Sequence, residues 1–293
     1  MIKIVDDNFT SIYRYILDVV NSKGTLEGKT RDVLDLGFEL TDINKSLLLY
    51  RKNWKWAFQE AFDRLSPLFN MPHNYMNPGF AYKYRPAWKR KLIKEEGTFD
   101  YSYGERFKDQ LPIAIEQLRK QKTTREAIVS VWGESYLIHQ DVFQRRPCTL
   151  TLHFLIRGKK LHLFVNMRTN DIINLLPYDV FHHSLLQKYV ATKLGLGFGS
   201  YHHHADHAYY PKKRERPGRN YFPEMHDKLS MQLAKPIKYC GFKSEDIDRD
   251  FIAAYDLLAG NCDIRPDNSY INNMVNLLMG EELTHEFSHL NFR

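Results

Sequence analysis

Apolar residues recur at helical spacing near the start of the chain. Within residues 8–21, the side chains of Ile12, Ile16, Leu17 and Val20 fall on one face of a helix, behind polar residues that can cap it. The same spacing predicts further helices over residues 53–65, 103–121, 177–196, 222–235, 244–260 and 268–287. A proline inside the second of these segments either kinks that helix or marks its true start.

Apolar runs of a different kind lie between these helices and predict strands. Residues 24–40 pass from a polar loop into an alternating strand, and residues 199–210 form another extended segment. Three more runs, residues 127–132, 147–158 and 160–167, are rich in β-branched and aromatic residues. The last two are separated by so few residues that they predict a hairpin.

Together these elements predict an α+β fold, in which helices flank a central sheet that is mostly antiparallel or mixed. We expect a core over residues 1–210 and a helical region over residues 211–293, packed on the core as one domain. The length of 293 residues and the 43% hydrophobic content are sufficient for a large packed core.

Composition and charge indicate the cellular location and the kind of partner that we expect. No run of 18 apolar residues occurs and the first residues do not resemble a secretion signal, so we expect a cytoplasmic protein that does not contact a membrane. Three cysteines without metal-binding spacing predict reduced thiols. The net charge of +7 favours anionic partners, but the basic residues are scattered, which fits a phosphate-bearing small molecule better than nucleic acid.

Cys148 is the first candidate for chemistry. A cysteine at the start of an apolar strand is most often a buried small hydrophobe. Here Arg145 and Arg146 precede it, and nearby cations lower the pKa of a thiol and favour the nucleophilic thiolate. A second candidate follows the predicted hairpin, where Arg168, Thr169 and Asp171 supply a guanidinium, a hydroxyl and a carboxylate suited to anchoring a phosphate or sugar.

The order of such motifs resembles that of the thymidylate synthases. The chain has Tyr-Gly at 103–104, Thr-Arg-Glu at 124–126, Pro-Cys at 147–148, Arg-Thr-Asn-Asp at 168–171, Pro-Tyr-Asp at 177–179 and Asp-His-Ala-Tyr at 206–209. The resemblance covers roughly residues 24–210. Each motif alone is weak, but six in family order are a specific signal.

The resemblance implies the catalytic residues. Cys148 looks like the nucleophile that adds to C6 of a pyrimidine nucleotide, so that C5 can attack the one-carbon unit of 5,10-methylenetetrahydrofolate. Glu60 matches the helix glutamate that manages proton transfer to the ring, and Tyr103 matches the tyrosine that assists removal of the C5 proton.

The resemblance also implies how the nucleotide is held. Arg168 looks like the main phosphate ligand, with Thr169 in place of the usual serine, and Arg31 matches a mobile phosphate-binding arginine. Arg125 resembles an arginine that reaches into the partner's site, which implies a homodimer formed through the sheet. The next residue, a glutamate, departs from the family's second arginine. His207 and Tyr209 match the pair that hydrogen-bonds the sugar 3′-hydroxyl.

Asp179 stands where a thymidylate synthase has asparagine. An asparagine amide pairs with N3–H and O4 of uracil, whereas cytosine presents an acceptor at N3 and a donor at its 4-amino group. A carboxyl group meets cytosine if it shares one proton with N3 and accepts from the amino group. Within the family, aspartate here is typical of the deoxycytidylate and cytidylate hydroxymethylases, in which water captures the exocyclic methylene intermediate.

Our first hypothesis is therefore a 5-hydroxymethylase acting on dCMP or CMP. C5 methylation of dUMP or dCMP is the enzymatic alternative. A non-catalytic nucleotide-binding relative and a metalloprotein are two further classes. Leu175 stands where thymidylate synthases have a glycine near the folate, and this difference fits a site that excludes water less completely.

Four of the 13 histidines fall in residues 202–207, which raises the question of a metal site. On a strand, side chains alternate, so His203, Ala205, His207 and Tyr209 share one face and the remaining histidines the other. The pleat divides the potential ligands, and we expect no metal here.

Overall fold

The computed structural model describes residues 2–48, 54–69, 103–133, 146–211, 227, 229–230 and 242–281. The strands in these residues are β1 (Ile2–Asp6), β2 (Thr25–Glu27), β3 (Thr30–Leu40), β4 (Ile128–Ser130), β5 (Thr149–Arg157), β6 (Lys160–Met167), β7 (Asn170–Asp171) and β8 (Gly197–Pro211). The helices are α1 (Phe9–Lys23), α2 (Trp54–Leu65), α5 (Tyr103–Phe107), α6 (Gln110–Lys120), α8 (Leu176–Lys193), α10 (Ile247–Ala259) and α11 (Ser269–Met279), with 3-10 turns η1 (Ile43–Lys45) and η2 (Ser66–Phe69).

All the described strands belong to one mixed sheet. Its order is β1-β3-β8-β6-β5-β4, with β2 beside β3 and β7 beside β8. The hairpins β2–β3 and β5–β6 are antiparallel, whereas β6 and β7 run parallel to β8. The predicted hairpin and the mixed sheet are confirmed. The sequence analysis missed β1, which pairs with β3 in parallel.

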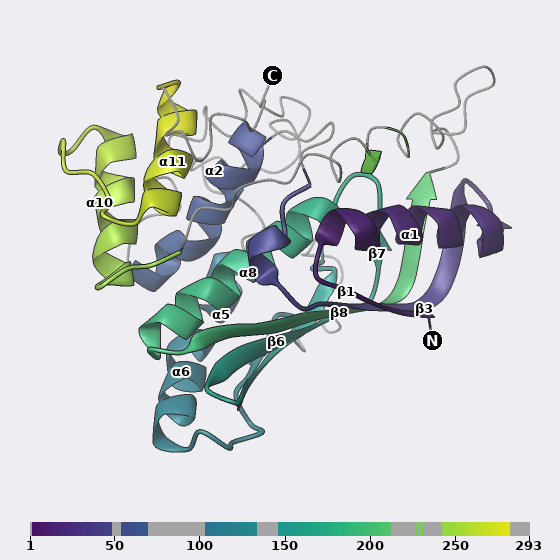
Figure 1. Ribbon diagram of the computed structural model, residues 1–293, viewed down its shortest axis with the longest axis horizontal. Coiled ribbons are helices and arrows are strands. Elements are labelled where there is room, and N and C mark those ends of the chain that lie inside the picture. Colours follow the sequence, from purple (N-terminus) through teal and green to yellow (C-terminus); the bar gives the residue numbers. More distant parts are fainter. Residues whose placement is uncertain are drawn as a thin grey trace.

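Helices α1 and α8 lie on the same side of the sheet (Figure 1). On that side β8 buries Tyr201, His203 and Ala205, and the next two strands in the sheet order, β6 and β5, bury large aliphatic and aromatic residues. Helix α8 is buried along nearly its whole length because α2 and α10 contact it as well as the sheet. The core therefore lies between the sheet and α8.

Most predicted helices are confirmed with shifted ends. The side chain of Asn8 caps α1 by accepting from the backbone N–H of Thr10 at 2.9 Å. The predicted helix over residues 103–121 divides into α5 and α6, and Pro112 lies in the first turn of α6, so it marks a helix start. The predicted helix over residues 222–235 lies almost entirely outside the described residues.

The strict alternation predicted for the histidine strand fails beyond Ala205. Burial alternates from Tyr201 to Ala205 and then resumes at Ala208 and Tyr210, leaving His207 half-buried. On the neighbouring strand β3, Asp35 has a φ of 57°. The pairs Leu34–His207 and Leu36–Ala205 lie on either side of it, but Asp35 itself is not paired with a residue of β8. The left-handed conformation at Asp35 interrupts the regular pleat at this point.

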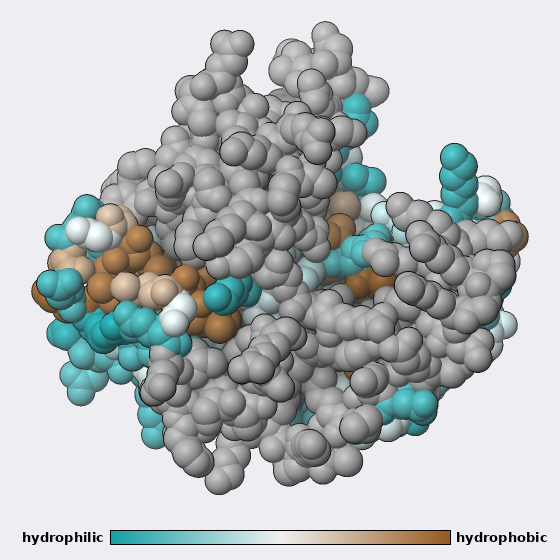
Figure 2. Space-filling view, turned by 90° about the horizontal axis from the view of Figure 1, so that it is seen from above, coloured by the Kyte–Doolittle hydropathy of each residue, from teal (hydrophilic) through white to brown (hydrophobic). Residues whose placement is uncertain are grey.

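Helices α10 and α11 pack on the outer side of α2. Tyr255 of α10 donates a hydrogen bond to the carbonyl of Phe62, and Tyr189 of α8 donates to Asp248 at 2.9 Å. Figure 2, seen from above, shows hydrophobic residues exposed at the end of the molecule that carries these two helices, where Ile252 and Ile264 lie at the surface. The boundary predicted near residue 210 adjoins residues outside the described part and stays a prediction.

None of the described helices has the length and apolar content needed to cross a membrane.

Candidate active site

Cys148 lies immediately before β5, at an irregular point in the sheet. The pairing of β5 with β6 shifts register between Thr149 and Thr151, which turns the chain next to the cysteine. The backbone N–H of Cys148 donates to the hydroxyl of Tyr103 at 3.3 Å, and its carbonyl accepts from the N–H of Arg168 at 2.9 Å. The fold thus brings Cys148, Tyr103 and Arg168 together.

Glu60 reaches this cluster through Arg64, one helical turn further along α2. The Arg64 guanidinium donates to Oε1 of Glu60 from Nη2 at 2.5 Å and from Nε at 3.1 Å. It also lies over the Tyr103 ring, 4.3 Å from the ring centre. The other oxygen of Glu60, Oε2, is buried and has no hydrogen-bond partner in the described part of the chain. It is therefore available to a bound molecule.

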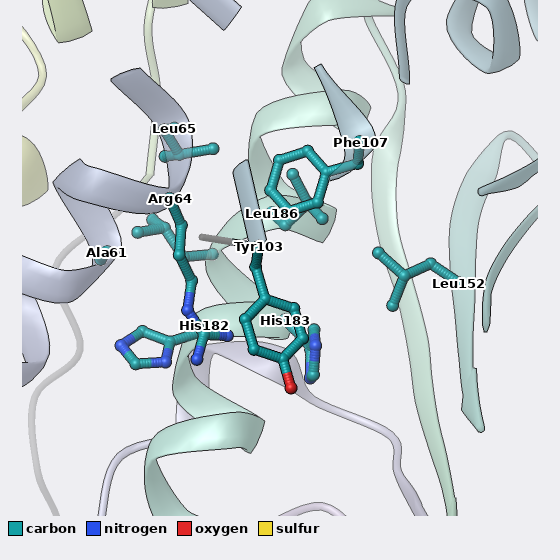
Figure 3. A pocket seen from close by; sticks show the side chains of 10 residues that line it. Ala61, Arg64, Leu65, Tyr103, Phe107, Leu152, His182, His183 and Leu186 are labelled. Atoms are coloured by element: carbon teal, nitrogen blue, oxygen red, sulfur yellow. The ribbon is translucent and has the colours of Figure 1, made fainter. Parts of the chain in front are cut away.

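Behind the cluster is a pocket between α2, α5 and α8. Arg64 and Tyr103 point the same way in it, toward His182 and His183 of α8 (Figure 3). Burial and the Arg64 charge hold the pKa of both histidines well below the ordinary value, so both are neutral. His182 is fixed by a 2.9 Å hydrogen bond to the carbonyl of Ala57.

Asp179, in the first turn of α8, is 7% exposed. Its Oδ2 accepts a 2.8 Å hydrogen bond from the side-chain amide of Asn170. Burial raises the pKa of Asp179 to about 7, and the charges of Arg64 and the hydrogen bond from Asn170 offset only part of that rise. Arg64 is already paired directly with Glu60, so it stabilises the Asp179 carboxylate only from a distance.

The expected activation of Cys148 by preceding arginines is wrong for the described residues. Burial, and then the negative charge of Asp179, raise the pKa of the thiol, and the one cation that lowers it is Arg168. Arg145 lies outside the described residues, and Arg146 acts through its carbonyl, which accepts from Arg168 at 3.4 Å. The thiol form of Cys148 is therefore favoured in the free protein.

Arg168 is held in place by backbone carbonyls. Its Nε donates to the carbonyl of Pro147 at 3.0 Å, and the guanidinium lies 5.3 Å from the centre of the Trp132 ring. An arginine that is fixed in this way presents its remaining N–H groups in a defined direction, which suits a phosphate.

The sugar-binding pair predicted from the resemblance lies next to Arg168. His207 Nδ1 is 2.8 Å from the hydroxyl of Thr169, and its Nε2 is 2.9 Å from Asp32 Oδ2. Tyr209 stacks on His207 with ring centres 5.3 Å apart. Burial raises the pKa of Tyr209 to about 12, so its hydroxyl remains protonated and able to donate.

Three further predicted binding residues contact the protein itself or lie at the surface. Asp171 accepts hydrogen bonds from the N–H groups of Ile173 and Asn174 at 3.0 and 2.8 Å, so its carboxylate organises its own loop. Arg31 donates to the carbonyl of Gly24 at 3.1 Å, at the turn between α1 and β2. Arg125 is exposed before β4, and no hydrogen bond or ion pair joins it to the Cys148 cluster within the described residues.

The sequence analysis missed four residues that shape the site: Arg64, Asn170, His203 and Asp32. Only Arg64 carried a local signal, because a glutamate and an arginine four residues apart face each other on a helix. The other three act through partners distant in the sequence. No group of three histidine, cysteine or acidic side chains in the described residues is arranged to hold a metal ion.

Comparison with known proteins decides the family. A family model described as Thymidylate synthase matches residues 47–248, more than half of the chain. This chain belongs to the thymidylate synthase family. The matched residues include the Cys148 cluster, Asp179 and the strand that carries His207.

Individual members of the family are similar at a lower level. The thymidylate synthase of Bacillus atrophaeus is 28% identical over 160 residues, 50% of this chain and 67% of that protein. A protein of Methanocaldococcus jannaschii, named only provisionally as a thymidylate synthase, is 33% identical over 130 residues, 43% of this chain and 58% of that protein. The chain spans about half the length of the curated relatives it matches.

A solved structure confirms the family fold. The thermostable thymidylate synthase A of Bacillus subtilis aligns with a TM-score of 0.59 at 19% identity, over 78% of this chain and 85% of that one. The mixed sheet and the helices packed on it are thus those of the thymidylate synthase fold.

The buried Asp179 makes stability depend on pH. Its pKa rises from 3.8 to about 7 on folding, so between these values the folded protein keeps a proton that the unfolded chain loses. The stability that this group contributes is present below about pH 4 and is lost as the pH rises through about 7. Asp179→Asn should match the wild type near pH 4 and exceed it above pH 7, by up to about 4 kcal/mol.

Urea unfolding at about pH 4 and pH 8 measures this difference. The control is Asp206→Asn, because the Asp206 side chain is 60% exposed. A stability gap that is the same at both pH values would contradict the raised pKa of Asp179.

Proposed function

We propose that the protein transfers a one-carbon unit to C5 of a cytidine monophosphate, dCMP or CMP, and that the product is the 5-hydroxymethyl nucleotide. The supporting observation is the buried carboxyl group of Asp179, whose pKa near 7 lets it carry a proton at neutral pH. A carboxyl group that carries one proton can donate to N3 of cytosine and accept from its 4-amino group. Against uracil, an ionised Asp179 would leave an acceptor facing an acceptor at O4.

The groups around Cys148 fit the chemistry of this family. The thiol adds to C6 of the ring, which makes C5 nucleophilic, and its proton must leave as the bond forms. Tyr103 contacts the backbone of Cys148, and Arg64 lies over the Tyr103 ring and pairs with Glu60, whose Oε2 has no partner among the described residues. We assign proton transfer on the ring to Tyr103 and Glu60, with Arg64 orienting the Glu60 carboxyl group.

The remaining residues would hold the nucleotide and the folate. Arg168 and Thr169 bind the phosphate, and His207 and Tyr209 the sugar hydroxyl, by the geometry described above. 5,10-Methylenetetrahydrofolate supplies the one-carbon unit when bound. Leu175, half-buried at the start of α8 and four residues from Asp179, would contact it.

Methylation is the second candidate function. The relatives are named thymidylate synthases, and these names favour C5 methylation over hydroxymethylation. Asp179 argues against dUMP as the substrate but is compatible with methylation of dCMP. The two reactions can be told apart by their folate product, because methylation oxidises the folate to dihydrofolate and hydroxymethylation releases tetrahydrofolate.

Cys148→Ser should abolish the release of tritium from C5 of a labelled cytidylate, by at least about 1000-fold, because a serine hydroxyl is a far weaker nucleophile than a thiolate. Cys262→Ser is the matched control, since Cys262 is also a half-buried free cysteine. The assay follows tritium release together with absorbance in the dihydrofolate band. Release without dihydrofolate supports hydroxymethylation, and release with it supports methylation. No release from any labelled nucleotide by the wild type would disprove the proposed reaction.

Asp179→Asn should shift the preference from cytidylates toward uridylates. An asparagine amide that accepts from N3–H with its oxygen and donates to O4 with its NH₂ group pairs with uracil in both directions, and in that orientation it faces cytosine with like groups. We expect a change of about 100-fold in the ratio of kcat/KM for dCMP and dUMP, equivalent to about 3 kcal/mol. An unchanged ratio would show that Asp179 does not read the base.

A homodimer completes the site in this proposal. The sheet face that α1 and α8 do not cover carries Val5, which is 56% exposed, and Ile128, which is 46% exposed, with Phe164 stacked on His202 at 4.1 Å between them in the strand order. A second copy packed on this face would bring its own exposed Arg125 toward the site of the first. Arg125 then adds a cation to the phosphate.

Mixing two inactive variants tests the crossed site. Arg125→Ala and Cys148→Ser should each be inactive alone, but a mixed dimer has one site that carries both defects and one that carries neither. Random pairing of equal amounts should restore about one quarter of the wild-type activity. The control mixes Glu60→Gln with Cys148→Ser. In this proposal both residues act in the site of their own protomer, so each site of a mixed dimer has one defect and no activity should return. Recovery would show that a protomer supplies more than Arg125 to its partner's site. Failure of the Arg125 mixture to recover, with dimers present by light scattering, would place Arg125 in its own protomer's site or outside both.

A further inference from the structure

A chain of hydrogen bonds runs through the core and ends on Asp179. The hydroxyl of Tyr201 lies 2.8 Å from Nδ1 of His203, and Nε2 of His203 lies 3.2 Å from Oδ1 of Asn170. The amide nitrogen of Asn170 then donates to Oδ2 of Asp179 at 2.8 Å. Tyr201 is fully buried, and the exposed fractions of His203, Asn170 and Asp179 are 2%, 2% and 7%.

The direction of one hydrogen bond sets the direction of the others in this chain. The NH₂ group of Asn170 donates to Oδ2 of Asp179, so the carbonyl oxygen of Asn170 points the other way. The Asn170 carbonyl then faces His203 and requires a donor, which places the imidazole proton on Nε2. Nδ1 of His203 is left as an acceptor for the Tyr201 hydroxyl. Reversal would require Asn170 and His203 to change together.

The core around His203 keeps it in this state. Its ring stacks on Phe38 with centres 4.9 Å apart and planes 10° apart, so it cannot turn freely. Burial, and then the neighbouring His204, lower the pKa of His203 to about 3. The other titratable groups near this core are His183, Tyr201 and Asp179, and the first two are neutral for the same reason.

We propose that His203, acting through Asn170, is a specificity-determining positioning residue that leaves Asp179 only one oxygen on which to carry its proton. Oδ2 faces the NH₂ group of Asn170, and two donors cannot share that contact, so the proton lies on Oδ1. Within the described residues, the hydrogen bond from Asn170 is the one bond that the Asp179 carboxyl receives, and Oδ1 is left for the base. This inference rests on the proposed reading of cytosine by Asp179.

The consequence for recognition is geometric. A free carboxyl group can rotate or carry its proton on either oxygen, so half of its states present an acceptor to N3 of cytosine. With the Asn170 amide fixed, the donor to N3 and the acceptor for the 4-amino group are set before the nucleotide binds. Fixing a polar group in its binding geometry in advance increases specificity for the matching base.

Two substitutions separate this role from simple packing. His203→Phe keeps a ring against Phe38 but removes the donor to Asn170, so the amide can turn. His203→Gln keeps a donor within reach of Asn170. We expect the ratio of dissociation constants for dUMP and dCMP, measured by calorimetry, to fall about tenfold in the phenylalanine variant and to stay within about threefold in the glutamine variant.

The Asp179→Asn background supplies the matched control. There no proton is shared with N3, so we expect His203→Phe to change the ratio by a smaller factor than in the wild type, which a double-mutant cycle detects as a coupling between residues 203 and 179. Nitrogen-15 NMR gives an independent signature. The resonances of His203 are assigned by their loss in His203→Gln. They should report a neutral ring with its proton on Nε2 between about pH 5 and pH 8.

The possible outcomes are distinct. A wild type that prefers dCMP and keeps this preference in His203→Phe overturns the role of His203 but leaves the proposed function standing. An equal loss of affinity for both nucleotides assigns His203 to packing and also overturns the inference, as does a proton on Nδ1. A wild type that binds neither nucleotide, or that prefers dUMP, overturns the proposed base and the role of His203 with it.

Discussion

The burial of one carboxyl group, that of Asp179, constrains most of the site. An aspartate with 7% exposure loses nearly all of its hydration, and its ionised form is stabilised only by what the protein supplies. The protein supplies one hydrogen bond from Asn170 and the more distant charge of Arg64. Since Arg64 is directly paired with Glu60, the Asp179 carboxyl stays close to the balance between its two protonation states.

The same arrangement explains two other features of the cluster. The negative charge of Asp179 raises the pKa of the Cys148 thiol, so the proposed nucleophile and the proposed base-reading group influence one another before any nucleotide is present. Arg64 connects the two acids to Tyr103 through its position over the ring. One arginine on α2 thus pairs with Glu60 of the same helix and acts from a distance on Asp179 of α8, so α2 and α8 must dock correctly for Arg64 to stabilise the Asp179 carboxylate.

The importance of Asp179 follows from membership in the thymidylate synthase family. The relatives carry that family name, and the fold matches a thymidylate synthase structure at 19% identity. Family and fold fix where the nucleotide would lie but not which base it carries. That choice depends on a few buried polar atoms, and their directions follow from the requirement that each buried donor meets an acceptor.

Periodicity and motif order allowed much of this to be predicted. The amphipathic helices α1, α2 and α8, the β5–β6 hairpin and the candidate residues Cys148, Glu60, Tyr103, Arg168 and Asp179 follow from the sequence because each carries a local or ordered signal. The structure brings these five residues together. It also shows what local pattern could not, such as the raised pKa of Cys148 and the hydrogen bonds of Asp171 within its own loop.

Residue identity by itself determined that a carboxyl group stands at position 179, where we propose that the base is read. Only the tertiary structure decided the state of that group, because its charge depends on burial and on partners from β7, β8 and α2. His203 lies 24 residues after Asp179 in the sequence and 33 after its hydrogen-bond partner Asn170, and the residues around it along the chain do not indicate either connection. Spacing along a chain specifies faces of helices and strands, whereas the direction of a buried hydrogen bond is set by all the groups that meet in the core.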